Sequence, residues 1–265
     1  DSDELENRFP AGKANLCTSS LYYDALVSAA YLGKALKKEH KQIKSYQDRA
    51  AELYKNIDVY FARNVEGYDT YRYYDGNTVL RSWICIPLTM GIYEQAKGTV
   101  EALFSDKLWM ENGLLTQSGT STYWDRSTLY AFRGAYSCGA RDIATEYLDK
   151  YSATRLLGDH VPYAVEAWPE GNQRHLSTES ALYCRIMTEG LFGIRPIALD
   201  AFVMTPQLPE SWNTMSLKRI CAFGSIFDIE VKRDKDNKLS VLIKKDHKIV
   251  KRSKIMNGKP IEVRI

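Results

Sequence analysis

The sequence predicts a mainly helical chain, a stack of antiparallel helical hairpins, followed by a small antiparallel β-sandwich. Two observations carry this prediction. Seven segments before residue 190 space their apolar residues three and four positions apart, as amphipathic helices do. After Ile194 the segments alternate apolar and polar residues with a period of two, which is typical of strands. We therefore expect a helical domain over residues 1–196 and a β-domain over residues 197–265.

The expected helices are joined by connections that alternate between short and long. Helices are expected over residues 21–36, 43–62, 78–93, 98–108, 126–137, 140–152 and 177–189. The loops before the first, third, fifth and seventh helices are long and rich in glycine, aromatic and acidic residues. In a stack of antiparallel hairpins every second connection lies on the same face. The long loops are therefore expected to share one rim, the usual place for functional residues on a rigid scaffold.

The C-terminal region consists of period-two segments that follow a proline-rich turn, TPQLPESW. Strands are expected over residues 216–223, 225–234, 238–246, 247–253 and 260–265. Their Lys and Arg residues alternate with Ile, Val and Leu, so we expect these basic residues to form the solvated face of a sheet rather than a binding patch.

Composition excludes several classes of function. The net charge of +3 on 265 residues is too small to indicate a nucleic-acid partner. No run approaches the roughly 20 apolar residues that cross a membrane, so no membrane partner is expected. Five cysteines lie far apart without a CxxC pair, and we expect them to be buried free thiols. The sequence contains no recognisable nucleotide loop, GxSxG nucleophile or metal-ligand spacing, so neither cofactor nor metal is expected.

The long loop over residues 155–177 holds the strongest candidate site. A globular protein seldom keeps about 20 residues without regular structure unless they have a function. This loop combines acidic, aromatic, amide and basic side chains. The mixture suits a sugar, because sugar rings stack on indole faces while their hydroxyls need many donors and acceptors. The candidate site residues of this loop are Glu166, Trp168, Glu170, Arg174 and His175.

The order of these features resembles that of a known enzyme class. The helical hairpins, the YAVEAW loop before the last helix, and GIRP and TPQLPESW leading into strands resemble the six-hairpin (α/α)6-barrel glycoside hydrolases. The resemblance is nearest to bacterial α-L-rhamnosidase-like and glucosidase/trehalase-like enzymes with a C-terminal β-domain. It implies an (α/α) toroid of twelve helices, of which the predicted seven correspond to the last seven. It also implies a glycosidase, and such enzymes are often periplasmic or secreted.

The resemblance implies roles for individual residues. A glutamate between the last two barrel helices acts as general base in those families, and in this chain it corresponds to Glu166. The WDRSTLYAFRGA segment resembles the loop that lines the sugar pocket, which implies pocket roles for Trp124, Asp125 and Arg126. The general acid of those families lies upstream, either outside this chain or before its first predicted helix. The acids in that stretch of this chain are Asp3, Glu4 and Glu6.

Several residue assignments remain open between a functional and a structural role. An inverting glycosidase needs one protonated carboxyl group and one ionised carboxylate that activates water. Glu170 is the alternative to Glu166 as that base. Asp125 can cap the fifth helix instead of binding sugar, and Trp124 and Trp168 can be plain packing residues. Tyr74 and Asp75 are candidate substrate-binding residues because their loop falls on the predicted rim.

The expected partner is a carbohydrate substrate, and three other functions stay open. A non-catalytic carbohydrate-binding relative would keep the aromatic rim without an acid. A polysaccharide lyase would need groups that abstract a proton beside a uronate, and a scaffold would present an apolar rim. The chain begins with DSDELENRFPAGK, which is not typical of a signal peptide or a natural start, so a longer precursor is expected. Half a toroid would expose apolar flanks, which predicts a missing N-terminal segment or self-association.

Overall fold

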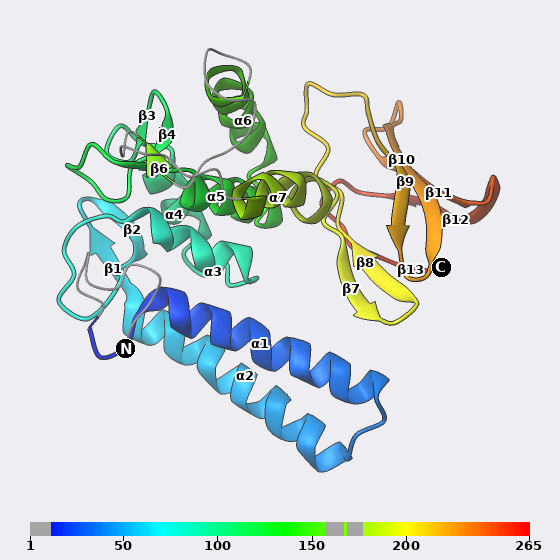
Figure 1. Ribbon diagram of the computed structural model, residues 1–265, viewed down its shortest axis with the longest axis horizontal. Helices are drawn as coiled ribbons and strands as arrows, with labels where there is room; N and C mark the ends of the chain where they lie inside the picture. Colours follow the sequence, from blue (N-terminus) through cyan, green and yellow to red (C-terminus); the bar gives the residue numbers. More distant parts are fainter. Residues whose placement is uncertain (1–11, 157–166, 169–176) are drawn as a thin grey trace. The chain divides into compact units, whose positions relative to one another are not determined.

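A computed structural model of the chain describes residues 12–156, 167–168 and 177–265 (Figure 1). The chain divides into two compact units, Asp1–Ile186 and Met187–Ile265. The described part of the first unit is mainly helical, and the second unit is built from antiparallel strands. The predicted order, helices followed by antiparallel strands, is therefore confirmed. None of the described helices is both long and apolar enough to cross a membrane.

The first unit begins with a hairpin of two long helices, α1 (Leu16–Ala35) and α2 (His40–Phe61). Helix α1 begins earlier than predicted because Asn15 caps it, with the Asn15 Oδ1 accepting a hydrogen bond from the Thr18 N–H at 2.7 Å. The two helices lie side by side and approach closely at Gly33 (Figure 1). A Cβ added to Gly33 would lie only 3.0 Å from an Ile43 side-chain carbon, so glycine permits this packing.

A β-hairpin follows α2, where the sequence predicted only a loop. Strand β1 (Ala62–Val65) pairs with β2 (Tyr68–Tyr71) through a turn in which Glu66 and Gly67 have φ values of 51° and 98°. Turns of this kind usually hold Asn-Gly or Asp-Gly, so the Glu-Gly pair carried no clear hairpin signal. The Glu66 carboxylate stabilises the unusual backbone by accepting hydrogen bonds from the Leu80 N–H at 2.7 Å and a serine hydroxyl at 3.1 Å.

The third predicted helix, over residues 78–93, is wrong in its extent. The structure has a 3-10 turn, η1 (Ser82–Ile84), and a short helix, α3 (Cys85–Thr89). The residues before η1 are extended because Arg81 forms a β-bridge with residue 117. After α3 the backbone of Gly91 has a φ of 85°, which ends the helix. The apolar spacing therefore identified buried residues but not the length of the helix.

Helix α4 (Ala96–Leu103) is shorter than predicted and packs against β2 at a glycine. A Cβ on Gly98 would lie 1.9 Å from the carbonyl oxygen of Asp69. Beside this contact the hydroxyl groups of Thr70 and Thr99 are 2.7 Å apart and fully buried. The backbone of α4 therefore lies almost directly on the hairpin, and only glycine fits at this position.

Replacing Gly98 with alanine is expected to destabilise the protein. In an exposed helix alanine is favoured over glycine by about 1 kcal/mol, but overpacking costs about 1–3 kcal/mol and here the clash is with backbone. Thermal unfolding should show a lower Tm for Gly98→Ala. The control is Glu101→Ala on the exposed face of α4, which should change the Tm little. An unchanged or higher Tm for Gly98→Ala would contradict the close contact.

The remaining helices of the first unit are α5 (Asp125–Ser137), α6 (Arg141–Arg155) and α7 (Ser177–Arg185). Most residues of α5 are buried. Figure 1 shows α5 with α3, α6 and α7 around it, and each of these helices contacts α5. Residues Ile186–Leu191 continue α7 as a π-helix, where the sequence predicted α-helix to residue 189. The loops add two short antiparallel pairs: β3 (Trp109–Met110) with β4 (Gly113–Leu114), and β5 (Tyr123–Trp124) with β6 (Ala167–Trp168).

The second unit contains a four-stranded sheet, in the order β12-β11-β10-β9, and a three-stranded sheet, in the order β13-β8-β7. The five predicted strands correspond to β9–β13, whereas β7 and β8 were not predicted. The strands are β7 (Arg195–Ala198), β8 (Ala201–Met204), β9 (Thr214–Ala222), β10 (Ser225–Arg233), β11 (Leu239–Lys245), β12 (Lys248–Ile255) and β13 (Ile261–Arg264).

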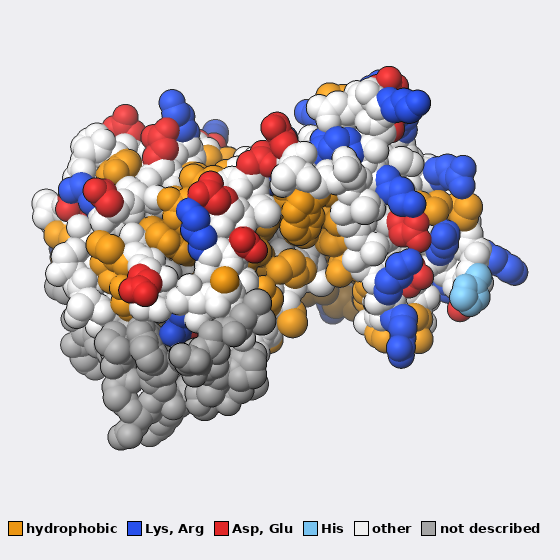
Figure 2. Space-filling view, turned by 90° about the horizontal axis from the view of Figure 1, so that it is seen from above, with side chains coloured by type: hydrophobic (Ala, Val, Ile, Leu, Met, Phe, Trp, Pro, Cys, Tyr) orange, Lys and Arg blue, Asp and Glu red, His pale blue; other side chains and the backbone are white. Residues whose placement is uncertain are grey.

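The two sheets of the second unit share an aromatic core. The Phe202 ring of β8 stacks on Phe223 and Phe227 at centroid distances of 5.3 and 5.7 Å. Figure 2 shows Lys and Arg side chains spread over the surface of this unit. Two of them, Lys218 and Lys244, lie 3.1 and 3.4 Å from the Glu230 carboxylate. These contacts fit the expected solvated face of a sheet.

All five cysteines are free thiols, as expected. Cys17 and Cys85 are buried. The expectation of burial is wrong for Cys184 and Cys221, which are exposed. Cys221 lies near the end of β9, where alternate residues face outward. Apolar character alone could not indicate which face of the strand this residue occupies.

Candidate functional site

Four consecutive residues, 123–126, contact the end of α6, strand β6 and the start of α7; we call them the 123–126 anchor. Its first two residues form β5, which pairs with β6: Tyr123 lies opposite Trp168 and Trp124 lies opposite Ala167. Glu166 directly precedes Ala167 in the sequence. The backbone pairing therefore places the chain immediately after Glu166 against Trp124.

The last two residues of the anchor form ion pairs with the two ends of the same segment. Asp125 Oδ2 accepts a hydrogen bond from Arg155 Nη2 at 2.9 Å, and these side chains are only 1% and 2% exposed. Arg126 Nε donates to Glu179 Oε1 at 2.6 Å, and the Glu179 side chain is 0% exposed. Arg155 ends α6 and Glu179 lies in the first turn of α7. The anchor thus contacts the last residue of α6, strand β6 and the first turn of α7.

The Asp125–Arg155 pair lies in a buried polar cluster with Tyr151. Burial, together with the Asp125 carboxylate, raises the pKa of Tyr151 well above its ordinary value, so the phenol stays protonated. Asp125 is the first residue of α5, while the N-cap position is Trp124, which has no side-chain cap hydrogen bond. The carboxylate near a helix N-terminus is favoured by the helix dipole. The capping role considered for Asp125 is therefore replaced by an ion pair.

The indole of Trp124 belongs to a buried aromatic cluster. Trp124 is 3% exposed, and its ring centroid lies 5.8 Å from that of Trp83. Trp83 in turn lies 6.0 Å from Tyr130. Neither Trp83 Nε1 nor Trp124 Nε1 has a hydrogen-bond partner among the described residues. In this structure Trp124 is packed, and its ring presents no open face for stacking.

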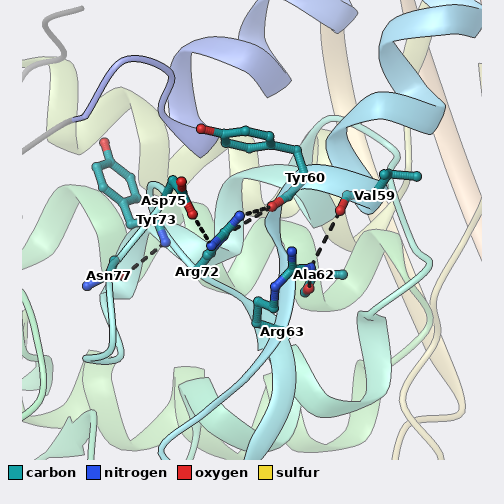
Figure 3. Close-up of polar contacts among 8 residues, drawn as sticks. All are labelled: Val59, Tyr60, Ala62, Arg63, Arg72, Tyr73, Asp75 and Asn77. Carbon is teal, nitrogen blue, oxygen red and sulfur yellow. Dashed lines mark hydrogen bonds and ion pairs between the residues drawn. The ribbon is translucent and has the colours of Figure 1, made fainter.

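The loop that carries Tyr74 and Asp75 is organised by two arginines. Figure 3 shows Arg72 between Asp75, with which it forms an ion pair, and the Tyr60 carbonyl oxygen, to which Arg72 Nη2 donates at 2.8 Å. The Arg81 guanidinium carbon lies 4.8 Å from the centroid of the Tyr73 ring and 5.4 Å from that of Tyr74. Tyr74 is thus held by a cation–π contact, and Asp75 by a partly exposed ion pair.

Short backbone bridges connect this tyrosine loop to the 123–126 anchor. Arg81 bridges Gln117, and Leu115 bridges Tyr123, which also pairs with β6. Backbone pairings therefore connect residue 81 to residues 115–117, these to residue 123, and residue 123 to residue 168. These contacts join parts of three of the long loops, and their common rim stays a prediction.

Several predicted site residues lie outside the described residues. For Trp168 the structure describes only the backbone, in β6. The others lie wholly outside the described ranges; they are Glu166, Glu170, Arg174, His175, Asp3, Glu4 and Glu6. Over the ranges described, no group of three or more His, Cys, Asp or Glu side chains is arranged to hold a metal ion.

Three residues of the site were not predicted from the sequence. Arg81 and Arg155 carried no signal, and the sequence STES, which begins at Ser177, predicts only a capping role for Glu179 at the start of its helix. Its Oε1 instead accepts from Arg126, while Oε2 has no hydrogen-bond partner within the described ranges. The pairs join residues 30 and 53 positions apart. A single sequence does not reveal such pairings, because the burial of the opposite charges becomes visible only in the structure.

Comparisons with known proteins place the fold among glycosidases. A scan against protein-family models and a search of curated proteins give no match. Among solved structures the chain is similar to a sialidase, with a TM-score of 0.70 and 16% identity, over 94% of this chain and 26% of the sialidase. It is also similar to the neutral trehalase of Saccharomyces cerevisiae, with a TM-score of 0.53 and 17% identity, over 66% of this chain and 38% of the trehalase. Both neighbours are glycoside hydrolases, and the chain has a glycosidase-like fold that spans a minor part of each.

Proposed function

We propose that this chain contributes the general base of a glycoside hydrolase that cleaves an oligo- or polysaccharide. The observation that carries the proposal is the triple attachment of the segment around Glu166 to the 123–126 anchor. The middle attachment pairs Ala167 with Trp124, and the outer two are buried ion pairs. A catalytic carboxylate must be held in place by rigid supporting groups, and these attachments would supply that support. The glycosidase-like fold of the neighbours supports the same reaction class.

The proposed mechanism is hydrolysis with inversion. Glu166, ionised, would take a proton from the attacking water, while a carboxylic acid protonates the leaving oxygen from the other side of the sugar ring. The acid would come from residues upstream of α1 or from outside this chain. Trp168, Arg174 and His175 would contact the sugar. Arg126 would act through Glu179 to orient the loop, and Asp125 through Arg155, because both anchor side chains are engaged in ion pairs.

We further propose that the helical unit is the C-terminal part of an (α/α) toroid, related to α-L-rhamnosidase-like or glucosidase/trehalase-like enzymes. The alternation of short and long connections supports this arrangement, and the shared Phe202 core supports a β-sandwich in the second unit. The missing N-terminal segment or self-association would cover α1, where Leu32 and Leu36 are 57% and 60% exposed.

The experiment is a hydrolysis assay of the full chain against a panel of substrates. The panel contains aryl α-rhamnoside, α- and β-glucosides, α-mannoside and β-galactoside, together with trehalose. Turnover of at least one substrate is expected, and NMR should show a product of inverted anomeric configuration. Calorimetry and sedimentation of the same preparation measure sugar binding and self-association.

Each other outcome distinguishes a rival function. Sugar binding without turnover would mean that the general acid is missing from this chain or that the chain only binds carbohydrate, and it would contradict catalysis by this chain alone. An unsaturated uronate product, detected by its ultraviolet absorbance, would identify a lyase. A compact monomer in sedimentation would contradict the proposed self-association.

A further inference from the structure

A cavity of about 640 Å³ lies in the groove between α1 and α2, away from the residues of the candidate site. Residues between Tyr23 and Lys34 of α1 and between Gln47 and Lys55 of α2 line it, together with Gly91. None of its lining residues belongs to the 123–126 anchor or to the loop from Arg72 to Arg81. Its volume falls within the range of about 300–1,000 Å³ that is typical of small-molecule sites.

Three tyrosines and a set of small residues give this cavity its shape. The rings of Tyr23 and Tyr54 are 5.4 Å apart and tilted by 55°, and Tyr31 is 39% exposed at the mouth. Ala30 and Ala50 are buried between them. Aromatic walls of this kind suit the apolar face of a sugar ring.

Polar side chains at the same cavity are donors and cations. The lining includes Lys34, Lys55 and Gln47. No ion pair joins Lys34 or Lys55 to any residue of the described ranges, and both residues are exposed, so their ammonium groups are accessible to a carboxylate of a ligand. Burial, and next a side-chain hydrogen bond to the Glu94 carboxylate, raise the pKa of Tyr54, so its hydroxyl stays protonated and donates to Glu94. The cavity is therefore rich in groups that bind hydroxyls and carboxylates.

We propose that this cavity is a second, non-catalytic carbohydrate site that binds a short acidic oligosaccharide. The tyrosines would contact the sugar rings, Gln47 their hydroxyls, and Lys34 and Lys55 a carboxylate. A cationic ligand, which three tyrosines could otherwise hold by cation–π contacts, is disfavoured by the two lysines. A purely apolar ligand would leave the lysines and the amide without partners. The site is independent of Glu166, so its failure would leave the proposed hydrolase function standing.

The test is calorimetry of the full chain with a trimer of galacturonic acid, and with maltotriose as an uncharged counterpart. The acidic trimer should bind more tightly. The double variant Lys34→Glu/Lys55→Glu should weaken its binding about tenfold or more, because each lost charged hydrogen bond is worth about 1.5–3 kcal/mol. The matched control is Lys38→Glu/Lys41→Glu, which makes the same change of net charge at exposed positions outside the cavity. The control should bind as the wild type does.

A second variant tests the cavity without relying on charge. Ala51→Trp adds a large side chain to the lining of the cavity and should abolish binding while the Tm stays near that of the wild type. The proposal is overturned if the wild type does not bind the acidic trimer, if maltotriose binds equally well, or if both double variants bind alike. It is also overturned if Ala51→Trp converts an oligomer to a monomer in sedimentation without affecting sugar binding, since the cavity would then be an interface.

Discussion

Replacing Arg155 with alanine is expected to lower the free energy of unfolding by about 3–5 kcal/mol, the usual cost of breaking a buried ion pair from one side. The variant leaves the Asp125 carboxylate 1% exposed and without this partner, beside a Tyr151 hydroxyl that stays neutral. Urea denaturation followed by tryptophan fluorescence measures the change. The signal is suitable because Trp83 and Trp124 lie in the cluster next to Asp125.

The same helix supplies a matched control for this prediction. Lys150 of α6 forms an ion pair with Glu146, but both side chains are more than half exposed, so Lys150→Ala should have no clear effect. The double variant Asp125→Leu/Arg155→Met removes both buried charges and should recover most of the stability, since apolar replacements of buried pairs are often neutral. Equal costs for Arg155→Ala and Lys150→Ala would contradict the buried pair.

Local periodicity predicted much of the fold. The alternation in SIFDIEVKRD places Phe227, Ile229 and Val231 on the buried face of β10, as the structure shows. The period-two pattern depends only on residues that are close in sequence, so one chain suffices to recognise it. The helical spacing of apolar residues likewise predicted α5 and α6 nearly to their ends.

The failures occur where distant contacts override local preference. Residues before η1 follow a helical pattern, yet the Glu66 side chain binds the Leu80 N–H and Arg81 bridges Gln117. Residues Ile186–Leu191 form a π-helix, although the apolar spacing predicted an α-helix up to residue 189. Propensity is a weak prior that tertiary contacts override.

In the described part of the candidate site, the sequence singled out residues 124–126 but not the contacts that they make. The WDR sequence marked residues 124–126 as important, but as contacts to sugar. The structure instead engages Asp125 with Arg155 and Arg126 with Glu179. No periodic pattern links such residues, because the pairing depends on how three helices pack around α5. The structural role of these ion pairs is indicated only by the burial of their charged side chains in the structure.

Replacing Glu166 with glutamine is expected to lower the hydrolytic rate by about 10²–10⁴-fold, the usual contribution of a general acid or base. Glutamine keeps the shape of the side chain but cannot accept the proton of the attacking water. Sugar binding should be retained, because the substitution removes neither the aromatic groups nor the anchor contacts. The matched control is Glu170→Gln in the same loop, which should reduce the rate at most a few-fold.

The most direct measurement is the turnover of the best substrate by wild type, Glu166→Gln and Glu170→Gln, with sugar affinity determined for each by calorimetry. We expect that only Glu166→Gln loses turnover, with its affinity for the sugar preserved. A Glu166→Gln variant that turns over substrate as fast as the wild type would contradict Glu166 as the base, and a loss confined to Glu170→Gln would assign that role to Glu170.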